Sequence, residues 1–96
     1  MSETKDAYVM KMKAKLDEWN AEIAKLEAKA KQKEADARKD FEEQIEELKA
    51  KRSKANEQLE QMSSAGESAW NDLKAGVEQA ADALGDALNA ARSRFS

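Results

Sequence analysis

Four glutamates between residues 42 and 47 are the groups in this chain whose spacing comes closest to that of a reaction centre. In the segment FEEQIEEL, Glu42, Glu43, Glu46 and Glu47 fall in neighbouring turns of a predicted helix, where they could face a partner helix as in di-metal bundles. Such a centre also needs a Glu-x-x-His motif on other helices, and the chain has no histidine. We therefore interpret the four carboxylates as a solvated charged face.

The other reactive side chains do not assemble into a recognisable centre either. Histidine and cysteine are both absent, which removes the commonest general base, the commonest transition-metal ligands and the thiol nucleophile. Lys11, Lys13 and Lys15 form a small basic cluster, but Asp17 and Glu18 flank it, and nucleic-acid binding needs a larger basic footprint. We expect a non-enzymatic protein with no metal and no other cofactor.

Composition indicates a single helical domain. The 96 residues include 39% charged side chains, no proline and many alanines, which is typical of long helices and coiled coils. The formal net charge of −3, with the two signs interspersed, gives no field that would attract nucleic acid. No stretch has the apolar length of a signal peptide or a membrane span, so we expect a cytoplasmic protein.

Large apolar residues in the first third of the chain recur in steps of four and three residues, the heptad pattern of a coiled coil. This N-terminal row comprises Tyr8, Met12, Leu16, Trp19, Ile23 and Leu26. The following stretch, residues 28–40, offers nothing larger than alanine to bury, and residues 31–36 contain no glycine, proline or asparagine to make a turn. One helix is therefore predicted from about residue 5 to residue 62.

A break follows at residues 63–66. Ser64 and Glu67 have the spacing of a capping box, and Gly66 could instead end the first helix in the left-handed conformation. A second helix is predicted from about residue 67 to residue 94, with an eleven-residue repeat that relates Leu73 to Leu84 and favours a straight helix.

A short loop between two amphipathic helices favours antiparallel neighbours, so we favour a helical hairpin. Its predicted core comprises Phe41, Ile45, Leu48, Leu59, Trp70, Leu73, Val77, Leu84 and Leu88. The alternatives are one continuous helix and a three-helix bundle with a second turn near residues 31–36.

The second arm of this hairpin ends near Glu34, so the N-terminal row has no partner within the chain. An exposed row of this size is more than a monomer normally presents to water. The predicted fold is therefore an all-α, coiled-coil-like helical hairpin that self-associates into a bundle, as a homo-oligomer with the N-terminal row as its interface.

The chain also resembles a family of small bacterial coiled-coil proteins, some of them described as cyanobacterial-type stress-response proteins. The resemblance rests on AYVMKMKAKLDEWNAEIAKLEAKA, QIEELKAKRSKANEQLE, GESAWNDLKAGVEQA and a terminal SRF, and LDEWNAEI and AWNDLKAGVE are its most distinctive parts. It implies a cytoplasmic helical protein without known catalysis and carries no functional site.

Two functions remain open at this point. The first is a structural or scaffolding protein that self-assembles. The alternative is a peripheral lipid-binding stress protein whose second helix settles on a membrane, although the acidic polar face of that helix, with Asp72, Asp82 and Asp86, disfavours an anionic surface. A heterologous protein partner is not indicated by any residue pattern.

Overall fold

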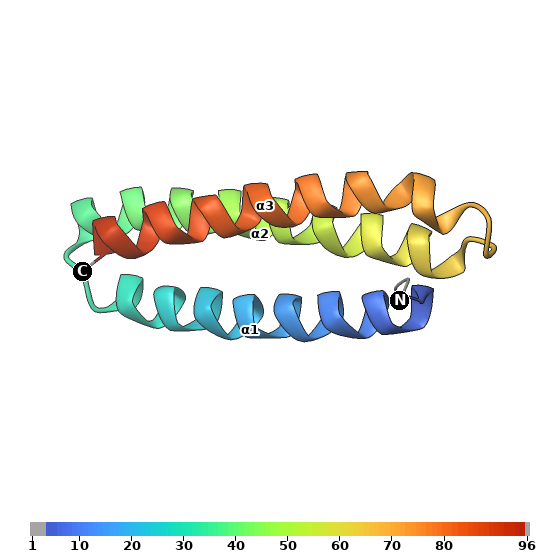
Figure 1. Ribbon diagram of the computed structural model, residues 1–96. Coiled ribbons are helices and arrows are strands. Elements are labelled where there is room, and N and C mark those ends of the chain that lie inside the picture. The colour runs from blue at the N-terminus through green and yellow to red at the C-terminus, as the bar shows by residue number, and fades with distance from the viewer. Residues whose placement is uncertain (1–3, 96) are drawn as a thin grey trace.

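The computed structural model describes residues 4–95, and all regular structure within them is helical. The helices are α1 (Lys5–Lys31), α2 (Ala35–Ser64) and α3 (Trp70–Phe95). They run up, down and up again in an elongated bundle measuring 51 × 19 × 17 Å (Figure 1). The prediction of an all-α helical bundle is confirmed.

The single helix predicted from residue 5 to residue 62 is wrong, because the chain turns back at residues 32–34. The observed arrangement is the three-helix alternative. Local sequence favours helix through this turn, but helix propensities differ by only fractions of a kcal/mol per residue. Burial of a single large apolar side chain contributes about 1.5–3 kcal/mol, so covering the N-terminal row outweighs the loss of a few helical residues.

The break predicted at residues 63–66 is present, and the connection extends to residue 69. Gly66 does not take the left-handed conformation, since no residue in the described part of the chain has a positive φ. Its carbonyl oxygen instead accepts hydrogen bonds from the backbone N–H groups of Ala69 (3.0 Å) and Trp70 (3.2 Å), which starts α3. The helix therefore begins three residues later than predicted.

The start of α1 closes the end of α2. The ammonium group of Lys5 donates to the carbonyl oxygens of Ser63 (3.2 Å) and Ala65 (2.8 Å). A cation at a helix C-terminus satisfies carbonyl groups that have no partner within the helix and interacts favourably with the helix dipole.

A core of apolar side chains runs the length of the bundle, and no polar or charged residue of the described part is fully buried. Each helix contributes a face spaced in threes and fours. The buried residues are Tyr8, Val9, Met12, Leu16, Ile23, Leu26 and Ala30 from α1, Ile45, Leu48, Ala55, Leu59 and Met62 from α2, and Trp70, Val77, Ala81, Leu84, Leu88 and Ala91 from α3. Trp19, Phe41 and Leu73 pack against this core and are partly buried.

The N-terminal row therefore lies inside the chain's own core. Five of its six members are buried, and Trp19 is partly buried against α3. The prediction that this row has no intramolecular partner is wrong, because the turn at residues 32–34 brings α1 back along α2 and α3.

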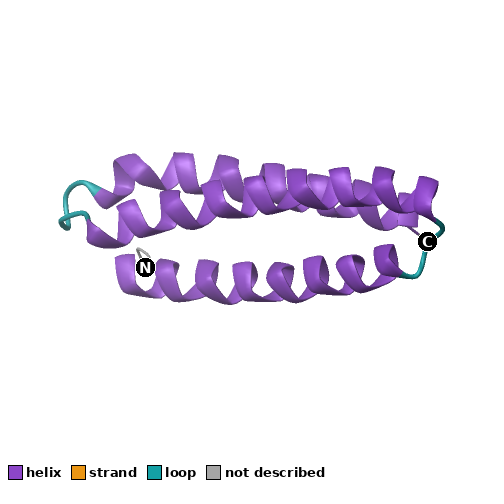
Figure 2. Cartoon of the chain, turned by 180° about the vertical axis from the view of Figure 1, so that it is seen from behind, coloured by secondary structure: helices purple, strands orange, loops and turns teal. Residues whose placement is uncertain are grey.

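The three helices are not equally close. Contact is most extensive between α2 and α3 and least extensive between α1 and α3. In both views α1 lies to one side of α2 and α3, which overlap each other (Figure 2). Large side chains project from α1, whereas alanine and glycine are frequent along α3, so the spacing follows side-chain size.

An aromatic cluster ties the first turns of α1 and α3 together. The rings of Tyr8 and Trp70 have centroids 6.1 Å apart, and the ammonium group of Lys74 lies 4.9 Å from the Tyr8 centroid and 5.9 Å from that of Trp70. The Tyr8 hydroxyl donates to the carboxylate of Glu78 at 3.3 Å. The buried ring thus keeps a partner for its polar end.

Replacing Ile23, which is 0% exposed, with alanine should lower the free energy of unfolding by about 2–5 kcal/mol, because a cavity opens in the core. Since this burial is intramolecular, the loss should be independent of protein concentration in urea titrations. Met10→Ala on the same helix is the matched control: Met10 is 71% exposed, and its truncation should change stability by less than about 0.5 kcal/mol. A loss that appears only above a threshold concentration would contradict the three-helix monomer core.

Candidate functional site

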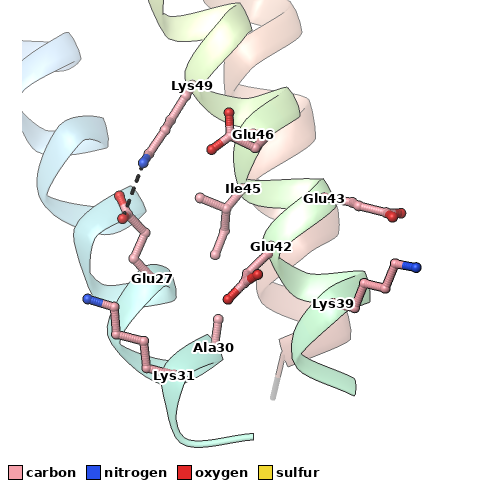
Figure 3. Close-up of a pocket in the computed structure, with 9 residues that line it drawn as sticks. All are labelled: Glu27, Ala30, Lys31, Lys39, Glu42, Glu43, Ile45, Glu46 and Lys49. Atoms are coloured by element: carbon pink, nitrogen blue, oxygen red, sulfur yellow. Dashed lines mark ion pairs between the residues drawn. The ribbon is translucent and has the colours of Figure 1, made fainter. Parts of the chain in front are cut away.

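Grooves between neighbouring helices are the concave surfaces of this bundle. One lies between α1 and α2, close to the turn at residues 32–34, and has a volume of about 350 Å³ (Figure 3). It is lined by Glu27, Ala30 and Lys31 of α1 and by Lys39, Glu42, Glu43, Ile45, Glu46 and Lys49 of α2.

The charges in this α1–α2 groove largely neutralise one another. Lys49 and Glu27 bridge the groove with an ion pair of 3.2 Å, drawn as a dashed line in Figure 3, and both side chains remain about one-third exposed. Lys39 and Glu43 point away from α1. Exposed pairs of this kind contribute little to stability, typically 0–1 kcal/mol.

The glutamates at 42–47 do not converge on one point. Glu42 approaches Arg38 at 3.9 Å and Glu47 approaches Lys51 at 4.0 Å, both along the surface of α2. Among residues 4–95, no group of three acidic, histidine or cysteine residues could hold a metal ion. Their placement fits the charged, solvated face expected from the sequence.

A second groove follows the outer boundary of α2 and α3. Two hollows along it have volumes of about 290 and 180 Å³. On α3 their lining includes Gly76, Ala80, Ala83, Ala87 and Ala90, which we call the small-residue row, together with Gln79, Ala91 and Arg94. On α2 the wall consists of Leu48 and of longer polar side chains, namely Gln44, Glu47, Lys51, Lys54 and Gln58.

The small-residue row has the heptad spacing of a helix interface. Its members follow one another in steps of four, three, four and three residues, so they form one line along α3. This line lies at the edge of the core rather than within it: Gly76, Ala80 and Ala87 are partly buried, and Ala83 and Ala90 are exposed. A row of small side chains in a groove allows another helix to approach closely.

Charges without partners flank this α2–α3 groove. The side chains of Lys54 on α2 and of Asp72, Asp86 and Arg94 on α3 make no ion pair or hydrogen bond within residues 4–95. All four are exposed. The groove therefore offers an apolar floor with unpaired charges of both signs beside it.

Two buried acceptor atoms also lack a hydrogen bond in the described part of the chain, Oδ1 of Asn20 and Oε2 of Glu22. The second carboxylate oxygen of Glu22 pairs with Arg92 at 3.3 Å. Two positions apart on an α-helix lie about 200° apart around its axis, so these atoms face different sides of α1 and form no common site.

The small-residue row was not predicted from the sequence. Its spacing is visible in Gly76, Ala80 and Ala83, but the eleven-residue repeat of larger side chains dominates the hydrophobicity pattern of this helix. The predicted interface residues, in contrast, are occupied within the core.

No family model, curated protein or solved structure matches the chain. The resemblance to small bacterial coiled-coil proteins stays a prediction. Among residues 4–95, no helix combines the length and apolar character needed to cross a membrane.

The two glycines within α3 should respond differently to alanine. A Cβ at Gly76 would lie 3.0 Å from the amide oxygen of the Gln58 side chain, whereas at Gly85 it would lie 3.2 Å from Cζ2 of the Trp19 ring. The Gln58 amide can swing into solvent, so Gly76→Ala should raise the free energy of unfolding by roughly 0.5–1 kcal/mol through helix propensity.

Gly85→Ala should raise the free energy of unfolding clearly less than Gly76→Ala does, because the partly buried indole of Trp19 must shift. Urea denaturation of both variants measures the difference. Equal stabilisation by the two substitutions would mean that Trp19 is not held against α3.

Proposed function

We propose that this chain is a non-enzymatic structural protein that self-associates by packing the α2–α3 groove of one copy against that of another. The observation that carries this proposal is the small-residue row, a heptad line at the edge of the core with unpaired charges of both signs beside it. The proposal keeps the self-assembly expected from the sequence but assigns it to a different surface.

Sterically, the small-residue row is suited to a helix that approaches closely. Packed helices lie about 8–10 Å apart, with the shorter spacing where the contacting side chains are small. Alanine also loses no side-chain entropy when it is covered, so docking there costs less than at a row of long side chains. The partner that matches this surface best is an identical surface.

Charge complementarity favours a second copy as the partner. Asp72 and Arg94 are each eleven residues from Ala83. When two α3 helices cross antiparallel about a two-fold axis at Ala83, Arg94 of each copy lies opposite Asp72 of the other. Lys54 and Ala80 line the same part of the groove, so the same axis brings Lys54 near the other copy's Asp86.

Binding to lipid is the weaker candidate. Its support is the wholly apolar core, which an opened bundle would present to a membrane surface. The exposed side of α3 carries Asp72, Asp82 and Asp86, and anionic headgroups repel such a face. Flotation with neutral and anionic vesicles separates the two functions, because a structural protein of the proposed kind should not float with either.

Ala83→Glu should abolish association through the α2–α3 groove, because the two-fold axis would place two carboxylates against each other in an apolar floor. Sedimentation velocity between about 10 μM and 1 mM measures the dimer fraction. Ala21→Glu is the matched control, an exposed alanine on α1 away from the groove, and it should leave association unchanged. A wild-type protein that is monomeric throughout this range would refute the proposed function.

The charge pairing predicts a compensating pair of substitutions. Lys54→Glu should weaken association by roughly ten-fold, since each dimer contains the affected pair twice and a close exposed pair contributes 0.2–1 kcal/mol. Adding Asp86→Lys should restore most of the affinity. If the double variant is no better than Lys54→Glu alone, these two residues do not meet across the interface.

A further inference from the structure

We propose that two copies of this chain can also exchange α1, with residues 32–34 acting as the hinge. In the exchanged form α1 and α2 join into one continuous helix, and α1 packs onto the α2–α3 pair of the other copy. This inference goes beyond groove assembly, because the surface involved is the core face of α1 rather than the exterior of α2 and α3.

The backbone of the turn leaves the helical conformation at Glu34. Gln32 has helical angles (φ −88°, ψ −5°), and Glu34 departs from them mainly through a ψ of 158°. No residue in the described part of the chain has a positive φ. Residues 31–36 also contain no glycine or proline, so the sequence of the turn does not oppose a continuous helix.

Few interactions hold the turn closed. All residues from 31 to 40 are exposed, and Glu34 at the start of α2 makes no side-chain capping bond, unlike Thr4, whose hydroxyl accepts from the Ala7 N–H at 3.2 Å. The backbone N–H of Arg38 donates to the Glu34 carbonyl at 2.7 Å, which is the spacing of a helical bond and is retained when the turn straightens.

The core faces of α1 and α2 would share one side of the continuous helix. Ala30, Lys33, Ala37 and Phe41 follow one another in steps of three, four and four residues. At about 100° per residue these positions stay on the same face, so the row from Tyr8 to Ala30 runs on into that of α2. With the hinge straight, the apolar rows of α1 and α2 therefore face the same partner.

The register of the closed bundle fits a symmetric exchange. Glu27 pairs with Lys49 at 3.2 Å, and the ammonium group of Lys33 lies 5.5 Å from the centre of the Phe41 ring. The midpoints of these two antiparallel pairs fall at residues 38 and 37. A two-fold axis near Ala37 thus reproduces both contacts between copies.

In the exchanged dimer, the contacts between α1 and the rest of the molecule form between the two copies. They include the ion pair of Arg92 with Glu22 at 3.3 Å, the hydrogen bond from Tyr8 to Glu78, and the Lys5 bonds at the end of α2. The new contact lies where the two hinges cross, near Ala37 of each copy. The closed and exchanged forms therefore differ mainly at the hinge, and protein concentration selects between them.

Disulfide trapping between two single-cysteine chains tests the exchange. The natural sequence contains no cysteine, so Glu27→Cys in one chain and Lys49→Cys in another introduce one thiol each. The two chains are mixed, unfolded, refolded together at about 1 mM and oxidised. A disulfide between position 27 of one chain and position 49 of the other is expected, because exchange places these residues side by side.

Two hinge substitutions supply the matched variants. Ala35 is the first residue of α2, where proline is well tolerated, and the extended ψ of Glu34 suits a following proline. Ala35→Pro should therefore keep the closed bundle, but it should lower the yield of the mixed disulfide about 100-fold, since proline disrupts the interior of a continuous helix. Ala37→Leu, exposed in the closed form, should raise the yield several-fold by pairing with its counterpart at the axis.

One chain carrying both cysteines provides the control for disulfide geometry. If it closes its own 27–49 disulfide while the mixed chains form none, exchange does not occur and the inference falls. The inference also falls if Ala35→Pro leaves the mixed yield unchanged. Neither result affects groove assembly, which the Ala83→Glu variant tests separately by sedimentation.

Discussion

Packing of the N-terminal row onto the α2–α3 pair is the interaction on which the rest of this structure depends. Without it, this row would expose its five buried side chains and the indole of Trp19 to water. At about 1.5–3 kcal/mol for each large side chain, their burial exceeds any preference of residues 32–34 for helix. The turn, the antiparallel order of the helices and the closed core all follow from this burial.

The side chains that the helices contribute to the bundle differ in size. Large side chains from α1 pack against the α2–α3 pair, whereas Gly76 and the alanines of α3 face α2 with little side-chain volume. Small residues at Gly76 and Ala80 leave a shallow floor beside the long side chains of α2. The α2–α3 groove is thus a consequence of how the core distributes its volume.

Much of the fold was predictable from the sequence. Heptad spacing from Tyr8 to Leu26 identified the buried face of α1, and the serine and glycine residues near 63–66 identified the α2–α3 connection. The turn at residues 32–34 was not predictable from local signals, because its residues are good helix formers. The turn forms because it allows α1 to be buried against distant parts of the chain. Helix propensity is a local property and does not include such contacts.

The prediction that the N-terminal row has no partner within the chain was wrong for a related reason. An apolar row such as Met12, Leu16 and Ile23 has the same pattern whether its partner belongs to the same chain or to another. The partner belongs to the same chain only if the chain turns back after α1, and this turn has no local sequence signal. The small-residue row was overlooked because alanine adds little to a hydrophobicity pattern, although it sets how closely helices approach.

The choice between a partner in the same chain and one in another chain is also open to the molecule itself. A chain whose turn lacks glycine, proline and a capping side chain holds its closed form through the core rather than through the turn itself. The core contacts made by α1 could be made by α1 of a second copy, as the proposed exchange requires, because they do not depend on the connection at residues 32–34. Charges on the α2–α3 exterior lie outside that core, so the proposed groove association would not depend on which copy supplies α1.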